Sequence, residues 1–149
     1  MLKISKKLMY ALEAVVDISY NSGVEPAQSR EINHRQGIPQ RYLEQVMQKL
    51  VRAGVLKGVR GPRGGYRLAR ERRRITVGEV ARVVNEIPDS EKNNTPSSEL
   101  AEKVMRPLWI EIEHGVMEQL NTITIEDLCR RAHARGIESV ANTKAHFDI

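Results

Sequence analysis

Four side chains in the segment 39–53 have the chemistry needed to read the edges of DNA bases. Arg41, Glu44, Gln45 and Gln48 recur there at steps of one, three and four residues. In the major groove of B-DNA, Arg pairs with guanine, Gln with adenine and Glu with cytosine. Because the same residue types are common on any solvated helix face, this pattern needs support from the elements around it.

The element that must position these side chains is a helix, which we expect over residues 39–53. Pro39 suits a first helical position, because its φ is already helical and no backbone donor is required there. Apolar residues recur at helical spacing and predict a buried stripe opposite the polar face. The stripe consists of Tyr42, Leu43, Val46, Met47, Leu50 and Val51.

A basic β-hairpin is predicted directly after this helix. Gly54 can adopt a positive φ and so end the helix, and short strands are expected at 55–59 and 66–68. The Gly- and Pro-rich connection between them is a hairpin signal. It carries Arg60, Arg63 and Arg67 to the tip. A helix followed by a basic hairpin is the arrangement of a winged helix-turn-helix.

The segments before residue 39 supply the other helices of that unit. Residues 5–20 form an amphipathic pattern that predicts a core-facing helix. Ser29 is a suitable N-cap for a short helix that runs to about Arg35, and Gly37 makes the turn into the next helix.

Charge is distributed unevenly along the chain. Residues 1–82 hold 17 Lys and Arg against 7 Asp and Glu, whereas residues 83–149 hold 7 against 12. A basic half joined to an acidic half is expected when only one half meets a polyanion. The basic run at 70–74, directly after the hairpin, would add contacts to phosphates.

The C-terminal half predicts a helix through which two copies of the chain associate. Thr76 caps a helix that reaches Val84, and a polar loop follows Pro88. Ser98 then caps a long helix that Pro107 kinks or interrupts. Its broad apolar stripe is more than one small domain can cover, which favours a dimer helix. The stripe consists of Leu100, Val104, Met105, Leu108, Trp109, Ile112, Val116 and Leu120. Thr124 begins a last helix over 125–134, and the tail from Ser139 is expected to be weakly ordered.

Catalytic and metal-binding patterns are incomplete. Glu111 and His114 form one half of a di-iron motif that needs a second copy, and Cys129 with His133 would supply only two ligands. We therefore predict no enzyme activity, no metal site and no cofactor. The single cysteine, Cys129, excludes an intramolecular disulfide and favours a reducing cytoplasm. No stretch has the length of a transmembrane helix or the pattern of a signal peptide, so no membrane partner is expected.

These motifs together resemble the IscR/NsrR/CymR group of bacterial winged-helix regulators. The resemblance is carried by the segments 42–45 (YLEQ), 60–68 (RGPRGGYRL), 76–80 (TVGEV) and 122–128 (TITIEDL). It implies a homodimer on a dyad-symmetric promoter site, with Arg41, Glu44 and Gln45 facing bases and Arg60 entering the minor groove. The predicted DNA-binding residues are Lys3, Lys6, Ser29, Pro39, Gln40, Arg41, Tyr42, Glu44, Gln45, Gln48, Lys49, Arg60 and Arg63.

One departure from that group concerns its iron–sulfur cluster. Cluster-binding members carry three cysteines in the loop before the long helix, and here the loop 88–98 has none. Because thiolates are the usual protein ligands of such clusters, a cluster of the usual kind in this loop is excluded by composition. The signal would then be a small molecule, a partner protein or a thiol reaction at Cys129.

We interpret the chain as a mainly α-helical, dimeric, cytoplasmic transcriptional regulator that binds double-stranded DNA and acts as a repressor. The predicted parts are a winged helix-turn-helix domain over 1–87, the loop 88–98, and a dimerisation helix, short helix and tail over 99–149. The alternative is a helical protein-interaction adaptor of the same fold without sequence-specific DNA binding. A metal-dependent enzyme on the long helix is a third, less favoured hypothesis.

Overall fold

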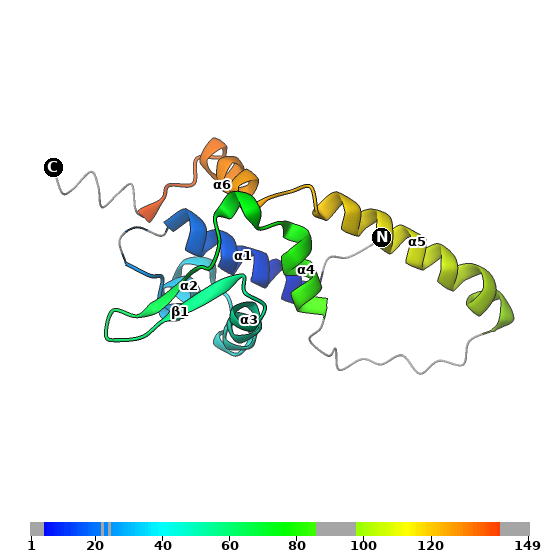
Figure 1. Cartoon of the computed structure of the whole chain (residues 1–149), viewed down its shortest axis with the longest axis horizontal. Helices are drawn as coiled ribbons and strands as arrows, with labels where there is room; N and C mark the ends of the chain where they lie inside the picture. Colours follow the sequence, from blue (N-terminus) through cyan, green and yellow to red (C-terminus); the bar gives the residue numbers. More distant parts are fainter. Residues whose placement is uncertain (1–4, 22, 24, 86–97, 141–149) are drawn as a thin grey trace.

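The computed structural model of the chain describes residues 5–21, 23, 25–85 and 98–140 (Figure 1). Within these ranges the fold is mainly helical, with one two-stranded antiparallel sheet. The elements are α1 (Lys6–Asn21), α2 (Ser29–Gln36), α3 (Gln40–Arg52), β1 (Leu56–Val59), β2 (Gly65–Leu68), the 3₁₀ helix η1 (Arg72–Arg74), α4 (Val77–Asn85), the π-helical η2 (Ala101–Met105), α5 (Arg106–Leu120) and α6 (Ile125–Ala134).

The core forms around α1, which packs against α2, α3, α4 and α6. Its inward face is built from small and branched residues that are fully buried: Ala11, Ala14, Val15 and Ile18. The predicted stripe of α3 is confirmed for Leu43, Val46, Met47 and Leu50. It is wrong for Val51, which is exposed, because one further residue rotates the side chain by about 100° away from the core-facing side.

Local signals set most of the boundaries. Gly37 and Gly54 have φ values of 67° and 78°, as the turns after α2 and α3 require. Ser98, Thr76 and Thr124 each accept a hydrogen bond from the backbone N–H three residues later, at 3.1 Å in every case. The predicted caps at these three residues are therefore confirmed.

Two predicted helix starts are wrong by one residue. Ser29 is the first residue of α2 and not its cap, because the extended Gln28 already accepts from the N–H groups of Glu31 and Ile32. Pro39 likewise precedes α3. Its ψ of 132° is not helical, although its carbonyl accepts the first intrahelical bond, from Leu43.

The hairpin is anchored to the chain before α2. Residues of β1 and β2 pair from Leu56 with Leu68 to Val59 with Gly65. Tyr66 also exchanges both backbone hydrogen bonds with Ala27, at 2.7 and 3.0 Å. A Cβ at Gly65 would lie 2.3 Å from the Ala27 carbonyl oxygen, so this close approach requires glycine. Arg67 lies in β2 opposite Lys57, so its predicted place at the tip is wrong.

The long helix continues from η2 into α5 and extends away from the other helices (Figure 1). The predicted interruption at Pro107 takes the form of a π-helical turn, in which the Arg106 N–H donates to the Ala101 carbonyl. Proline lacks a donor and crowds the carbonyl four residues before it, so the backbone widens there. Within the described ranges, no helix has the length and apolarity needed to cross a membrane.

The chain after α6 returns to α1. The Ser139 hydroxyl donates to the Tyr20 carbonyl at 2.6 Å, and the Val140 N–H donates to the Asn21 side chain at 3.0 Å. Ser139 is buried, so the prediction of a weakly ordered tail is wrong at this residue. The predicted loop over 88–97 and the rest of the tail lie outside the described residues.

Candidate nucleic-acid interface

The outer face of α3 is a solvent-exposed row of polar side chains. Arg41, Glu44, Gln45 and Gln48 are all exposed, while Leu43, Val46 and Met47 beneath them are buried. Gln40 is exposed as well and donates to the Glu44 carboxylate at 3.3 Å. The packed side of α3 thus holds the helix rigidly while its polar side remains free for contact.

Tyr42 and Lys49 flank this row and are half-buried. The Tyr42 ring contacts Tyr10 of α1, with centroids 5.8 Å apart, and the Arg41 guanidinium carbon lies 5.7 Å from the Tyr42 centroid. Tyr42 therefore orients Arg41 and also joins α3 to α1, a combination of roles that the sequence pattern did not indicate.

The hairpin, here called the wing, lies beside α3 and packs against it through β1 (Figure 1). Arg60 and Arg63 are exposed in the turn between β1 and β2. Arg63 lies 3.5 Å from the Glu25 carboxylate, a surface pair that contributes little to stability. A Cβ at Gly64 would lie 2.2 Å from the Val59 carbonyl oxygen, so glycine is needed for the tight turn that presents these arginines.

The remaining predicted DNA-binding residues differ in how far the structure describes them. Lys6 is exposed at the start of α1, Ser29 is half-buried at the start of α2, and Pro39 is exposed before α3. Lys3 lies outside the described residues.

Several arginines of the basic run at 70–74 are paired with carboxylates. Arg70 bonds to Glu79, and Arg73 bonds to Glu71. The hydrogen bond from Arg73 lowers the pKa of the Glu71 carboxyl, and the bond to Glu79 raises the pKa of Arg70. The run therefore offers less unpaired positive charge than its sequence suggests.

A buried ion pair between α1 and α2 was missed by the sequence reasoning. Asp17 is 2% exposed and accepts hydrogen bonds from Arg35 and Gln36, which end α2. Its spacing from Ala14 and Ile18 could have indicated burial, but nothing in the sequence identified its partners. The pair holds α2 in place, and α2 precedes the turn into α3.

Cys129 is buried on α6, and its thiol lies 3.5 Å from the Ser19 hydroxyl. Glu111 and His114 are exposed on α5, where His114 approaches Glu118 at 3.5 Å. Within the described ranges, no group of three or more His, Cys, Asp or Glu side chains is arranged to hold a metal ion.

An α2–turn–α3 unit, an exposed polar helix face and a basic wing together define a winged helix-turn-helix protein that binds DNA. The family model for Rrf2, described as an iron-dependent transcriptional regulator, matches residues 4–131. The chain belongs to the Rrf2 family and is a DNA-binding transcriptional regulator.

Relatives and solved structures agree with this assignment. The HTH-type transcriptional regulator IscR of Vibrio atlanticus (strain LGP32) is 35% identical over 131 residues, which cover 87% of this chain and 76% of the relative. The T. potens IscR structure is similar with a TM-score of 0.72 and 35% identity, covering 93% of each chain. The structure of CymR, the global cysteine regulator of B. subtilis, is similar with a TM-score of 0.67 and 37% identity, covering 88% of this chain and 98% of that one. The adaptor alternative is not favoured.

The family description raises the question of whether this chain can hold iron through cysteines. Its one cysteine is buried against Ser19, and the loop 88–98 contains none. Iron–sulfur clusters are usually held by four protein ligands, most often thiolates. The donor set of this chain does not fit a cluster of that kind.

Proposed function

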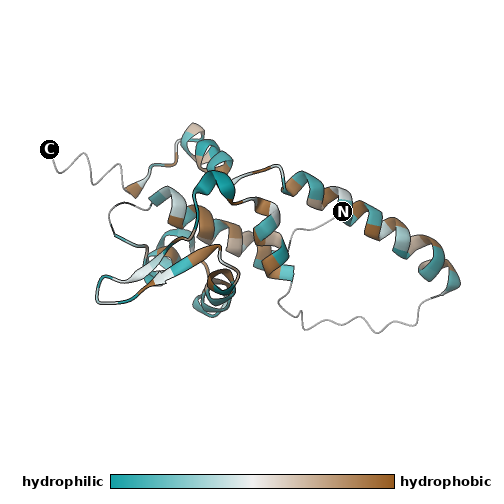
Figure 2. Ribbon diagram, in the orientation of Figure 1, coloured by the Kyte–Doolittle hydropathy of each residue, from teal (hydrophilic) through white to brown (hydrophobic). Residues whose placement is uncertain are grey.

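We propose that this regulator acts in the cytoplasm as a homodimer that represses transcription by occupying a dyad-symmetric promoter site. The observation that carries the proposal is the apolar surface of η2 and α5. None of the residues of these two elements is buried, and hydrophobic residues recur along the helix (Figure 2).

We infer that a second copy of the chain buries this surface. Leu100, Val104, Met105, Leu108, Trp109 and Val116 are between 43% and 63% exposed. Exposed apolar patches of this extent mark interaction sites in soluble proteins. Two such helices packed against each other would bury both stripes, in the manner of a coiled-coil seam.

Dimerisation would bring two reading units to one DNA duplex. We infer that α3 of each unit enters the major groove, with Arg41, Glu44 and Gln45 toward the bases and Gln40, Gln48 and Lys49 beside them. Arg60 of each wing would enter the adjacent minor groove, while Lys6 would contact phosphates. Half-sites for such dimers are spaced by about one helical turn, roughly 34 Å, or a multiple of it.

Regulation would then depend on a signal other than a cysteine-ligated cluster. We infer that a small molecule or a partner protein changes the affinity of the dimer for its promoter site. No catalytic role is proposed.

The test combines sedimentation equilibrium with selection of genomic fragments retained by the protein. The parent should sediment as a dimer and retain fragments that share an inverted repeat. Leu108→Glu should give monomers and lose the preference for the full repeat over a half-site. His114→Glu, on the opposite face of α5, serves as the control and should remain dimeric. A monomeric parent that prefers single half-sites would contradict the proposal.

A further inference from the structure

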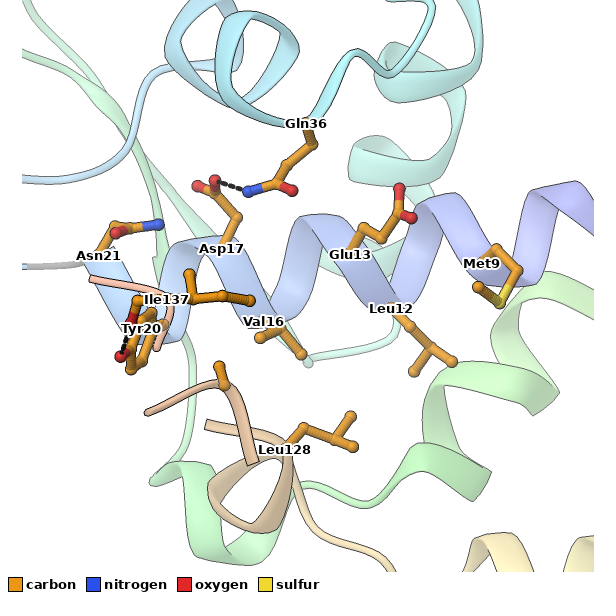
Figure 3. A pocket seen from close by; sticks show the side chains of 11 residues that line it. Met9, Leu12, Glu13, Val16, Asp17, Tyr20, Asn21, Gln36, Leu128 and Ile137 are labelled. Atoms are coloured by element: carbon orange, nitrogen blue, oxygen red, sulfur yellow. Dashed lines mark hydrogen bonds between the residues drawn. The ribbon is translucent and has the colours of Figure 1, made fainter. Parts of the chain in front are cut away.

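A cleft of about 280 Å³ lies between α1, α6 and the chain that follows α6 (Figure 3). Its apolar wall is formed by Leu12 and Val16 of α1, Leu128 and Ala132 of α6, and Ile137. In Figure 3, Leu12 and Val16 point toward Leu128. The volume is near the lower end of small-molecule sites, which suits a ligand smaller than a typical drug.

One polar side chain of this cleft has no partner among the described residues. Asp17 is bonded to Gln36, the Tyr20 hydroxyl donates to the Ile137 carbonyl, and Asn21 accepts from Val140. The Glu13 carboxylate makes no such contact, and partial burial raises its pKa. A carboxylate partly removed from water is stabilised when a cation pairs with it.

We propose that this cleft is the effector site of the regulator and that it binds a small apolar amine. In Figure 3 the Glu13 carboxylate points to the side of α1 where Asp17 and Gln36 lie, so the cationic nitrogen would pair with it at that edge of the cleft. The hydrocarbon part would extend across α1 to Leu12, Val16 and Leu128. Charge complementarity selects this class of ligand, because an anion would be repelled by Glu13 and a neutral hydrocarbon would leave the carboxylate unpaired.

The position of the cleft connects it to the DNA-reading unit. Asp17 lies one helical turn after Glu13, lines the same cleft, and holds Arg35 and Gln36 of α2. A ligand that shifts this turn of α1 would therefore act on the contacts that position α2 and, through it, α3. This regulatory step rests on the proposed function, because it requires the effector to bind the free dimer and the DNA-bound dimer with different affinities.

Binding is tested on the full-length protein without DNA, so that its failure is separate from any failure of promoter binding. Calorimetric titrations at pH 7 use cyclohexylamine as the probe, with cyclohexanol and cyclohexanecarboxylate as neutral and anionic controls of similar shape. The parent should bind the amine saturably, at one site per chain, and the two controls at least about tenfold more weakly, since hydrogen bonds to charged groups are among the stronger ones.

Three variants locate the site. Glu13→Gln should weaken amine binding about tenfold or more, and Ala132→Phe should block it by filling the cleft. Glu113→Gln, an exposed carboxylate of α5 outside the cleft, should bind the amine as the parent does. Circular dichroism establishes that each variant is folded. Sedimentation of Ala132→Phe separates a blocked ligand site from a lost contact between copies.

Each outcome decides the proposal. The proposed amine site would be contradicted if the parent showed no saturable amine binding, or if Glu13→Gln bound the amine as tightly as the parent. Dissociation of the Ala132→Phe dimer would overturn it too, in favour of a contact with the second copy. In the parent, saturating amine should change the dissociation constant of the promoter fragment severalfold, and this change should be absent in Glu13→Gln. An unchanged constant in the parent would overturn the regulatory role.

Discussion

The carboxylate of Asp17, in the C-terminal part of α1, accepts two hydrogen bonds from the guanidinium of Arg35, at 2.8 and 2.9 Å. The Asp17 side chain is completely buried, whereas that of Arg35 is 21% exposed. The contact raises the pKa of Arg35, chiefly through the hydrogen bond. A two-point contact between a planar guanidinium and a carboxylate fixes orientation as well as distance. It therefore holds the end of α2 at a defined angle to α1.

Removal of Arg35 should destabilise the fold strongly. Arg35→Ala leaves a buried carboxylate with only Gln36 as a partner, and breaking a buried pair in this way costs about 3–5 kcal/mol. Urea denaturation measures the free energy of unfolding. Arg30→Ala, an exposed residue of the same helix, is the matched control and should change it by less than about 0.5 kcal/mol. A loss below about 1 kcal/mol for Arg35→Ala would show that the pair is not important for stability.

Substitutions on the outer face of α3 should change sequence preference. Arg41→Ala or Gln45→Ala should cost about 1–3 kcal/mol on the preferred site and relax selection at one base pair. Glu44→Ala should instead accept more sequences, because a carboxylate can act by rejecting wrong bases. Competition binding against a library of sites measures both effects. Equal losses on preferred and random DNA for all three variants would contradict this assignment.

Arg60 of the wing should act through the shape of the minor groove. A narrow A·T-rich groove has an enhanced negative potential, so Arg60→Ala should weaken binding most at sites with A·T-rich flanks. Lys6→Ala should weaken binding regardless of flanks and lower the slope of log K against log salt by about 1. Titrations at several salt concentrations with two flank compositions measure both. Unaltered binding of Arg60→Ala to A·T-flanked sites would argue against groove reading.

Cys129 should be inert, and the purified protein should be colourless even when prepared without air. Oxidation of a thiol requires access from solvent, and Cys129 is only 3% exposed beside Ser19. Peroxide and iron chelators should leave promoter binding unchanged in both the parent and Cys129→Ser. Loss of binding after peroxide in the parent alone would make Cys129 the sensor. Absorption in the visible range would indicate a cluster.

The capping box of α6 should make stability depend on pH in the acid range. Hydrogen bonds from the Thr124 backbone and side chain lower the pKa of Asp127 below its ordinary value of 3.8. A carboxyl whose pKa is lower in the folded state stabilises the fold at pH values above its unfolded-state pKa. That stabilisation is lost as the pH falls through the folded-state pKa. Asp127→Asn should therefore lose stability at neutral pH and show a shallower decline below about pH 4 than the parent. If the parent and Asp127→Asn lost the same stability as the pH falls, this prediction would be contradicted.

The order of elements and most of their boundaries follow from local chemistry that the sequence displays directly. A hydroxyl at Thr76 or Thr124 reaches a backbone N–H only three residues away, and Gly37 and Gly54 permit a positive φ without help from any neighbour. The polar row at Arg41, Glu44, Gln45 and Gln48 also depends only on the helical repeat. For this reason the winged helix-turn-helix and its candidate reading face could be predicted.

The tertiary structure decided which polar groups are buried and what they contact. The partner of Asp17 lies 18 residues along the chain, and that of Ser139 lies 119 residues away. A helical repeat indicates which residues share a face, but not which element covers that face. Burial of Asp17 and exposure of Val51 follow from how α1, α2 and α3 pack, as does the cleft beside Glu13. Its apolar wall joins Leu12 and Val16 of α1 to Leu128 of α6 and to Ile137, segments that meet only in the folded chain.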